Sequence, residues 1–393
     1  MSENSVVIVG AKRTAIGSLL GQFTGVATPQ LGAAAIRAAL AQAGIAGDQV
    51  EEVLMGCVLP AGLGQAPARQ AALAAGISSA AACTTLNKVC GSGMKAIMLG
   101  HDALKLGNAR VVVSGGMESM TNAPHLLPGS RTGVKYGGFE ALDHMAWDGL
   151  VNPYDKQAMG AFGEQCVEKY AFTREAQDAF ASESVKRALA AQTSGAFKDE
   201  IAAVTVAGRK GDVVIDSDEQ PGKCDLSKIA TLKAAFKKDG TITAASSSSI
   251  NDGAAAAVLM RENDALARGL KPIARVLGHA THAQEPAWFT TAPAPAIRKL
   301  LKQVGWSVTD VDLFEVNEAF AVVAMAAMKE LDIPHAKINV NGGACALGHP
   351  IGASGARLVV TLIHALQARG LKKGIASLCI GGGEATAIAI ELV

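Results

Sequence analysis

The chain has few aromatic residues and no excess of either charge. Aromatic side chains make up 4% of its 393 residues, and 36 Lys and Arg oppose 35 Asp and Glu, for a formal net charge of +1 at pH 7. A nearly neutral chain has no overall field for nucleic acid or an anionic membrane, so we expect neither as a partner. A local basic pocket for an anionic ligand stays open. With so few aromatic rings, the cores must be built mainly from aliphatic side chains.

The cysteines show no paired spacing. The seven stand apart along the chain, without a CxxC pair or a Cys/His zinc pattern, at positions 57, 83, 90, 166, 224, 345 and 379. An odd, scattered set is typical of free thiols in a reducing compartment, and we predict no metal site from it. The first strand-like run, 6–10, leaves no room for a signal peptide before it. No charge-poor apolar run reaches about 18 residues. We therefore expect no membrane span and a cytoplasmic location.

Two parts of the chain repeat each other. The segment from Ala35 aligns without a gap with the segment from Ala296, Ser92 aligns with Ser354 and Val111 with Ser377, at offsets of 261, 262 and 266. Chance similarity between Ala-rich helices could explain the first match alone. Three matches in the same order indicate a duplicated domain, and the length fits two or three domains of roughly 150 residues.

Each half alternates strand-like and helix-like segments. The expected strands are 6–10, 51–58, 84–89, 109–116 and 254–260 in the first half, and 272–279, 311–317, 338–343, 375–383 and 387–393 in the second. This alternation predicts a layered α/β fold with largely parallel pairing. The polar stretch between Thr121 and about Ile250, within the first half, has no counterpart in the second half and carries two helical segments around 160–192. We divide the chain into a first half (1–121 plus 250–271), an inserted domain (122–249) and a second half (272–393).

A thiol and an imidazole stand in glycine-rich surroundings. Cys90 follows a strand and precedes a Gly-Ser-Gly helix start, where the helix dipole and unpaired N–H groups favour the thiolate and lower its pKa. His349 lies between Gly348 and Pro350 in a second glycine-rich segment. An imidazole can accept a proton from a thiol, so the two are candidates for a nucleophile and its base. The alternatives are a buried structural cysteine and a histidine satisfied by its surroundings.

Two further positions end strands. Cys379 is followed by three glycines whose N–H groups can face a developing oxyanion, although a third structural thiol is the alternative. Asn317, in the segment NEAF, can position a water or a carbonyl, or can simply cap the next helix.

At these positions the sequence resembles a known family. The segments NKVCGSGMKA, NEAF, GHPIGASGAR and CIGGG, together with GQAPARQAA, GGMESM and NDGAAA, look like those of the thiolases, the acetyl-CoA C-acetyltransferases. The resemblance covers essentially the whole chain in the family's order. It implies a duplicated, five-layered αβαβα fold with an inserted loop domain, and a homotetramer.

The resemblance also implies roles for the site residues. Cys90 would carry the acetyl group as a thioester, His349 would activate it, and Cys379 would act as the acid and base on the methyl group. The enolate oxygen would lie against His349 and a water held by Asn317. The thioester oxygen would lie against the backbone N–H groups of Cys90 and Gly381. The implied reaction is the reversible Claisen condensation of two acetyl-CoA to acetoacetyl-CoA and CoA.

The resemblance implies coenzyme A thioesters as substrates and no separate cofactor. Ser248 matches the family serine that meets the pantetheine arm, and Phe320 matches the aromatic residue beside it. Several positions depart from the family. Ala158 precedes Met159 where acetoacetyl-CoA-specific members have His, and Phe289 replaces a methionine. Pro221 stands where potassium-dependent members carry tyrosine, so we expect no potassium site.

Other functions stay open at this point. The chain could be a broader 3-ketoacyl-CoA thiolase of fatty-acid β-oxidation, or a non-catalytic member of the fold that binds acyl-CoA or lipid. A binding module needs neither thiol, so the presence of both favours an enzyme.

Overall fold

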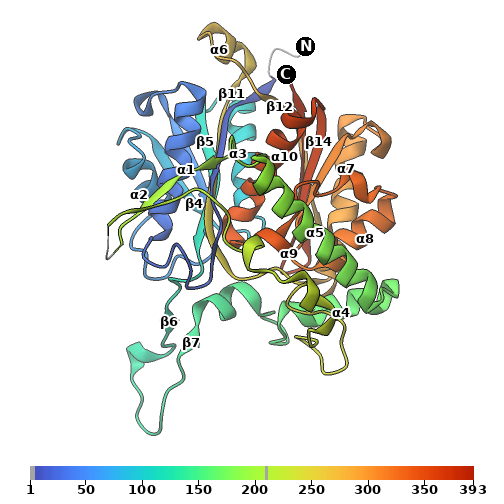
Figure 1. Ribbon diagram of the computed structural model, residues 1–393. Helices are drawn as coiled ribbons and strands as arrows, with labels where there is room; N and C mark the ends of the chain where they lie inside the picture. The colour runs from blue at the N-terminus through green and yellow to red at the C-terminus, as the bar shows by residue number, and fades with distance from the viewer. Residues whose placement is uncertain (1–4, 209–210) are drawn as a thin grey trace.

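The two halves form two similar half-sheets joined edge to edge (Figure 1). The computed structural model describes residues 5–208 and 211–393. The strands of the first half run in the spatial order β4 (Ala82–Leu86), β3 (Glu52–Gly56), β5 (Val111–Ser119), β11 (Asn251–Arg261) and β1 (Val6–Thr14). Those of the second half run in the order β13 (Leu313–Val316), β14 (Lys373–Ile380), β15 (Glu384–Leu392) and β12 (Ala274–Ala283). β1 and β12 pair antiparallel and join the half-sheets.

The strand directions repeat as well. In the first half β4, β3 and β5 are parallel, and β11 is antiparallel to both β5 and β1. In the second half β13 and β14 are parallel, and β15 is antiparallel to both β14 and β12. The expected strand at 338–343 is wrong, because only one bridge, between Phe314 and Ile338, stands where β4 lies in the first half. The chain turns at once, since Asn339 has a φ of 48°. The matching topology supports a duplicated unit.

Helices cover each half-sheet on both faces and produce five layers. The outer layer of the first half contains α1 (Thr28–Ala43) and α2 (Pro67–Ala74), the shared central layer α3 (Ser92–Leu106) and α10 (Ile351–Arg369), and the outer layer of the second half α7 (Pro293–Val304) and α8 (Ala321–Leu331). The short helices α6 (Glu262–Ala267) and α9 (Ala344–Leu347) lie in connections. The observed fold is the duplicated αβαβα architecture expected above.

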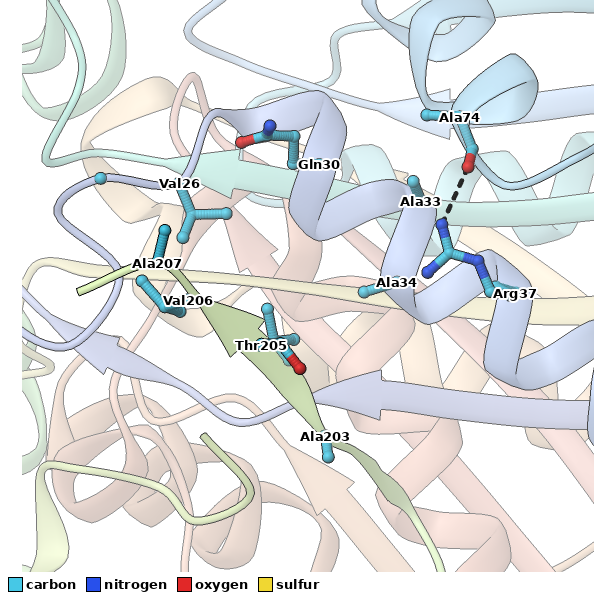
Figure 2. A pocket seen from close by; sticks show the side chains of 12 residues that line it. Val26, Gln30, Ala33, Ala34, Arg37, Ala74, Ala203, Thr205, Val206 and Ala207 are labelled. Atoms are coloured by element: carbon cyan, nitrogen blue, oxygen red, sulfur yellow. Dashed lines mark hydrogen bonds between the residues drawn. The ribbon is translucent and has the colours of Figure 1, made fainter. Parts of the chain in front are cut away.

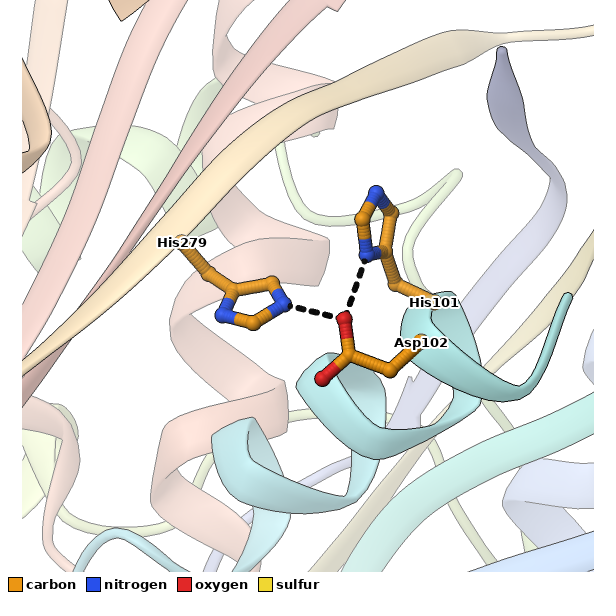
Figure 3. A group of neighbouring side chains, drawn as sticks. All are labelled: His101, Asp102 and His279. Carbon is orange, nitrogen blue, oxygen red and sulfur yellow. Dashed lines mark hydrogen bonds and ion pairs between the residues drawn. The ribbon is translucent and has the colours of Figure 1, made fainter. Parts of the chain in front are cut away.

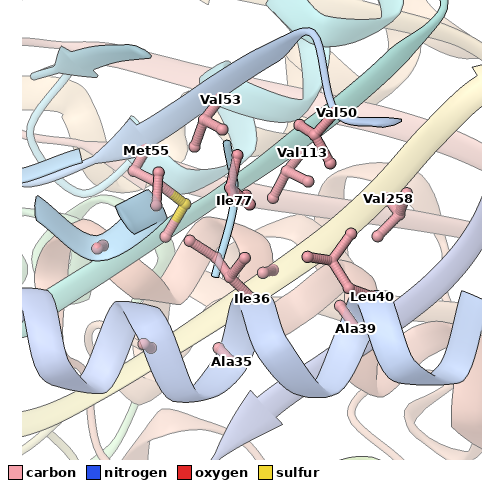
Figure 4. Packing of buried hydrophobic residues seen from close by; sticks show 14 of the residues in the cluster. Ala35, Ile36, Ala39, Leu40, Val50, Val53, Met55, Ile77, Val113 and Val258 are labelled. Carbon is pink, nitrogen blue, oxygen red and sulfur yellow. The ribbon is translucent and has the colours of Figure 1, made fainter. Parts of the chain in front are cut away.

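Small side chains of alternating orientation build the layers. Along β11, Ala254, Ala256, Val258 and Met260 belong to the core beneath α1, while the residues between them belong to the central core around α3 and α10. This is the period-two pattern of a strand buried on both faces. Figure 4 shows Ile36 and Leu40 of α1 packed among valines of the sheet. An aromatic-poor chain can therefore fill three apolar layers with Ala, Val, Leu, Ile and Met.

Helix α10 corrects one expectation. Its 19 residues are long and apolar enough to span a membrane by length and composition, so the expected absence of such a stretch was wrong. The helix lies between the half-sheets, however, and 89% of its most apolar 18-residue window is buried inside the protein. Its hydropathy is that of a central core helix packed on both sides.

The insertion between β5 and β11 starts at one end of the half-sheets and extends up to α1, where residues of β9 (Val204–Val206) and of this helix line one pocket (Figure 1). Its elements are β6 (His125–Leu126), β7 (Leu142–Asp143), α4 (Met159–Tyr170), α5 (Arg174–Ser194), β8 (Ile201–Ala202), β9 (Val204–Val206) and β10 (Val213–Ile215). The two expected helices are present as α4 and α5. β8 pairs with the end of β1, and buried Arg13 bonds Glu200 and Asp218 at 2.6 and 2.7 Å. β2 (Gly17–Ser18) pairs with β11 close by. These contacts fix the insertion to the body.

Candidate active site

A strained turn presents Cys90 at the start of α3. The chain leaves β4 at Leu86, and Val89 has a φ of 46°, which a β-branched residue rarely adopts. The Ser92 hydroxyl holds this turn, because it accepts the Lys88 N–H at 2.8 Å and donates to the Val89 carbonyl at 2.7 Å. The sulfur of Cys90 is therefore placed by a sharp strand-to-helix turn and stays half-buried. Turns of this kind position nucleophiles in other folds.

The end of β14 brings the second thiol to the first. Backbone N–H groups of Gly381 and of Cys90 itself lie near enough to the Cys90 sulfur to act on its pKa, so two donors converge where negative charge would develop. Cys379 is 1% exposed and close enough to Cys90 for the charge of one sulfur to act on the other. Ile380 packs against the Cys90 turn, since a Cβ on Gly91 would lie 2.4 Å from it. The two thiols thus come together from opposite halves of the chain.

His349 and Asn317 complete the group. The Nδ1 atom of His349 lies 2.5 Å from the Ser354 hydroxyl, which also lies 2.9 Å from the Pro350 carbonyl. If the hydroxyl donates to that carbonyl, it accepts from Nδ1–H and leaves Nε2 free as a base. Asn317 Nδ2 lies 3.4 Å from Nε2. The Asn251 side chain fixes the backbone by accepting the His349 N–H at 3.0 Å.

Asn317 has a polar atom left over. Its side chain is buried, and its Oδ1 atom has no hydrogen-bond partner. A buried carbonyl oxygen without a partner costs free energy unless a water or ligand occupies the space beside it. The helix-capping alternative does not apply, because the N-cap of α8 is Phe320. The arrangement fits an amide that holds a water or a substrate oxygen.

Burial keeps the resting groups neutral. Desolvation raises the pKa of Cys90 to about 11, against the two N–H donors, and the nearby Glu118 carboxylate adds to the rise. Burial also raises the pKa of Cys379 well above its ordinary value. Burial and the charge of Arg357 lower the pKa of His349 to about 3. The expectation that the helix N-terminus lowers the Cys90 pKa was therefore wrong, because desolvation outweighs the helix dipole.

The residues expected to meet substrate surround these groups. A pocket of about 270 Å³ opens beside the Cys90 turn between α4 and the Gly381 turn, with Met159 on its wall. Phe289 and Phe320 are buried with Cys379 in one apolar cluster. Ser248 lies next to them and donates its hydroxyl to the Ala319 carbonyl at 3.0 Å. Their contact with a pantetheine arm stays a prediction.

Sequence reasoning missed the groups that hold the site in place. Buried Glu118 accepts N–H groups from Val58, Leu59 and Gly352 at 3.0, 3.1 and 2.9 Å, and so ties the first half to the start of α10. Burial raises its pKa to about 7. Glu118 stands in the segment GGMESM, and Ser354 stands opposite Ser92 in the repeat. The motif around Glu118 and the repeat position of Ser354 were the sequence features from which the two residues could have been found.

A larger pocket lies elsewhere. A volume of about 550 Å³ opens between α1 and β9, on the outer face of the first half-sheet (Figure 2). Its walls are mostly alanine and valine, and the Arg37 guanidinium at its edge donates to the Ala74 carbonyl at 2.8 Å. No thiol, imidazole or carboxylate lines it. The smaller pocket, by contrast, adjoins the Cys90 turn through Val89 and Gly381.

Two thiols, an imidazole and an amide, converging where two repeats of a five-layered fold meet, define an enzyme of thiol-dependent acyl transfer. The chain belongs to the thiolase family: the model of the thiolase N-terminal domain matches residues 6–263, and that of the thiolase C-terminal domain matches residues 270–392.

Similar proteins carry one activity in their names. A probable acetyl-CoA acetyltransferase of Dictyostelium discoideum is 50% identical over 388 residues, covering 98% of this chain and 94% of that protein. An acetyl-CoA acetyltransferase of Pseudomonas aeruginosa is 49% identical over 387 residues, covering 98% of each. The crystal structure of the Bacillus anthracis acetyl-CoA acetyltransferase superimposes with a TM-score of 0.97 at 42% identity, covering 100% of this chain and 99% of that one.

Proposed function

We propose that the protein is an acetyl-CoA C-acetyltransferase that catalyses the reversible condensation of two acetyl-CoA to acetoacetyl-CoA and CoA. The observation that carries this proposal is the approach of Cys379 to Cys90 beside His349 and the Gly381 N–H group. One thiol suffices for acyl transfer to a second molecule. A second buried thiol is needed only if a proton must also be moved on carbon.

The first step transfers an acetyl group to Cys90. Its sulfur attacks the thioester carbonyl while His349 Nε2 takes the thiol proton. The negative oxygen is received by the N–H groups of Cys90 and Gly381, each worth about 3–4 kcal/mol in comparable sites. The carbon–sulfur bond to CoA breaks, and CoA leaves with the proton of Cys379. The His349 imidazolium and the Cys379 thiolate then offset each other's charge.

The second step forms the carbon–carbon bond. The Cys379 thiolate takes a proton from the methyl group of a second acetyl-CoA. The enolate oxygen lies against the Nε2–H of His349 and a water on Asn317 Oδ1. The enolate carbon attacks the acetyl group on Cys90, and the sulfur leaves with the His349 proton. Both thiols and the neutral imidazole are restored, so no external acid, base or reductant is consumed, and the CoA thioester is proposed as the only small molecule required.

Features away from the reacting atoms support further proposals. The β6–β7 hairpin projects from the body and exposes Tyr136 and Phe139 at 98% and 67%. Because an apolar hairpin tip suits association with a second copy, we propose a homotetramer, which light scattering at several concentrations tests.

The seven cysteines, all in the described part of the chain, are unpaired. This agrees with a cytoplasmic location, which cell fractionation tests.

Intact-protein mass spectrometry with acetyl-CoA tests the division of roles. Cys90→Ala is expected to acquire no acetyl group. Cys379→Ala is expected to acquire one on Cys90, because CoA can leave as a thiolate, yet to form no acetoacetyl-CoA. Cys224→Ala, which removes a half-buried thiol outside the site, should behave as wild type. An unmodified Cys90 in the Cys379→Ala protein would contradict the assignment.

A substrate-length series in the thiolysis direction tests the specificity. Acetoacetyl-CoA should give the highest kcat/KM, with a steep fall for longer 3-ketoacyl chains. Equal values for long chains would instead identify a broader 3-ketoacyl-CoA thiolase.

A further inference from the structure

Three side chains of types that can bind metals meet near the C-terminal end of α3. His101 and Asp102 lie near the C-terminus of this helix, and His279 reaches them from β12, in the other half of the molecule (Figure 3). The Asp102 Oδ1 atom lies 3.1 Å from His101 Nδ1 and 2.9 Å from His279 Nε2. One ligand atom from each side chain falls within 4.8 Å of the other two.

These separations are close to those of an occupied site. Zinc bonds of roughly 2.0–2.1 Å in a tetrahedron place neighbouring ligand atoms roughly 3.3 Å apart. The two distances from Asp102 Oδ1 already match this spacing within a few tenths of an ångström, and the two imidazole nitrogens, which lie within 4.8 Å of each other, would have to close around the cation. The Asp102 side chain is 44% exposed, while those of His101 and His279 are 10% and 17% exposed. The two imidazoles are therefore mostly buried, and water can reach the group from the side of the Asp102 carboxylate.

Packing alone does not account for the buried ring of His101. Its Nε2 atom is buried without a hydrogen-bond partner, so the ring is held only through Nδ1. Burial lowers the pKa of His101, assisted by the charges of His279 and Lys105 and opposed by Asp102. A neutral imidazole is the form that binds metals. An ordinary core position would favour an apolar side chain over a half-satisfied ring.

We propose that His101, Asp102 and His279 bind one divalent transition-metal ion of the zinc class, with solvent completing the coordination. Two imidazoles and one carboxylate favour zinc, cobalt or nickel over magnesium and calcium, which prefer oxygen ligands. The spacing of histidines along the sequence could not reveal this site, since its ligands lie 177 residues apart.

The ion would join the two halves of the molecule. Ser92 and His101 are nine residues apart on α3, which corresponds to roughly 14 Å along the helix. The ion therefore touches no reacting atom, and its role is to link α3, which carries Cys90 at its other end, to β12. Binding to the folded state alone raises the free energy of unfolding with the logarithm of the ligand concentration over Kd.

Cobalt(II) spectroscopy on chelator-treated, full-length protein tests the proposal. One cobalt per chain should bind with the visible ligand-field bands of nitrogen and oxygen coordination. His279→Gln is expected to weaken cobalt binding at least tenfold and to abolish the rise in Tm that zinc causes in wild type. His282→Gln, on the same strand but bonded to Gln284, is the matched control and should keep both effects.

Three results would overturn the proposal. They are the absence of cobalt or zinc binding, unchanged affinity in His279→Gln, and a thiolate-to-cobalt charge-transfer band that disappears in Cys90→Ala. The last result would place the metal on the active-site thiols. Metal-free Tm values of each variant show whether the substitution itself unfolds the protein. If neither ion binds, the three side chains form a hydrogen-bonded group only.

Discussion

The two helices of the central layer are equivalent in the repeat but differ in chemistry. Ser92 and Ser354 occupy the same position in their halves, and so do the next residues, Gly93 and Gly355. A Cβ on Gly93 would lie 2.9 Å from the Ala356 nitrogen, and one on Gly355 would lie 2.5 Å from the Met94 nitrogen. The first turns of α3 and α10 therefore cross in a reciprocal contact that only glycine allows on either side.

The residues just before these turns are not equivalent. At the same offset of 262, Cys90 stands opposite Gly352, and His349 stands opposite Asn87. Cys379 likewise stands opposite Val113, at the offset of 266. Each half supplies groups that the other lacks. Duplication therefore provides two helix starts that point to one place, and the reaction depends on their having diverged.

Replacing His349 by its counterpart should have the largest effect. His349→Asn removes the base and gives the second half the residue of the first. General acid–base catalysis contributes about 10²–10⁴-fold, so kcat/KM for thiolysis should fall by about 10³-fold, with slow acetylation of Cys90 as well. Stopped-flow and steady-state assays measure both.

The control for this variant is His282→Asn on β12, which should keep wild-type rates. Normal acetylation of Cys90 in His349→Asn would show that another group takes the thiol proton, and the assignment of the base to the second half would fail.

The sequence predicted the scaffold well for a physical reason. Strand and helix periodicities depend on local burial, and both survive in each repeat, so the two halves, the Cys90 turn and the end of β14 were all found. The segment at 338–343 failed because Asn339 turns the chain and bonds the Val316 backbone at 2.9 and 2.8 Å, a tertiary contact without local signature.

The electrostatics of the site could not be predicted in the same way. The helix start before Cys90 suggested a low thiol pKa. Desolvation, which depends on what α10 and β14 place around the sulfur, gives the opposite direction. Glu118 is a second example, because the N–H groups that bond to it come from a loop of the first half and from the first turn of α10 in the second half.

Two glutamates that occupy equivalent positions in the repeat differ in burial. Glu118 is fully buried, whereas Glu384, at the same place in the repeat, is 34% exposed and pairs with Lys88. Burial raises the pKa of Glu118 from 4.5 to about 7. The folded state therefore binds this proton more tightly than the unfolded state, and the resulting stability is present below pH 4.5 and is lost as pH rises to about 7.

Glu118→Gln should remove the loss of folding stability that wild type shows as pH rises. Relative to wild type, the free energy of unfolding of the variant should rise between pH 5 and pH 8 by at most about 3 kcal/mol, measured by urea denaturation. Because the Glu118 charge raises the Cys90 pKa, the acid limb of Cys90 acetylation should also move to lower pH. Glu384→Gln should keep the wild-type dependence, and a parallel change in both variants would remove the distinction between the two glutamates.

The reciprocal helix crossing can be broken from one side. Gly355→Ala places a methyl group 2.5 Å from the Met94 nitrogen, which the backbone can relieve only by moving α10 away from α3. We expect a loss of about 1–3 kcal/mol in the free energy of unfolding, typical of overpacking, together with lower kcat. Gly25→Ala, where no heavy atom lies within 4 Å of the added Cβ, is the control. Equal stability of the two variants would show that the crossing tolerates side chains.

The smallest effects are expected for substitutions of the two equivalent serines, which should differ in kind. Ser354 holds the imidazole of His349 through Nδ1, whereas Ser92 holds only backbone groups of the Cys90 turn. Ser354→Ala should lower kcat by about tenfold, which corresponds to about 1.4 kcal/mol, while KM for acetoacetyl-CoA changes little. Ser92→Ala should instead lower stability by about 1 kcal/mol through the lost hydrogen bonds. Ser354→Thr keeps the hydroxyl and should recover part of the rate. If both alanine variants changed kcat and stability alike, the two serines would have equivalent roles. The functional difference between the two helix starts would then be limited to Cys90 and His349.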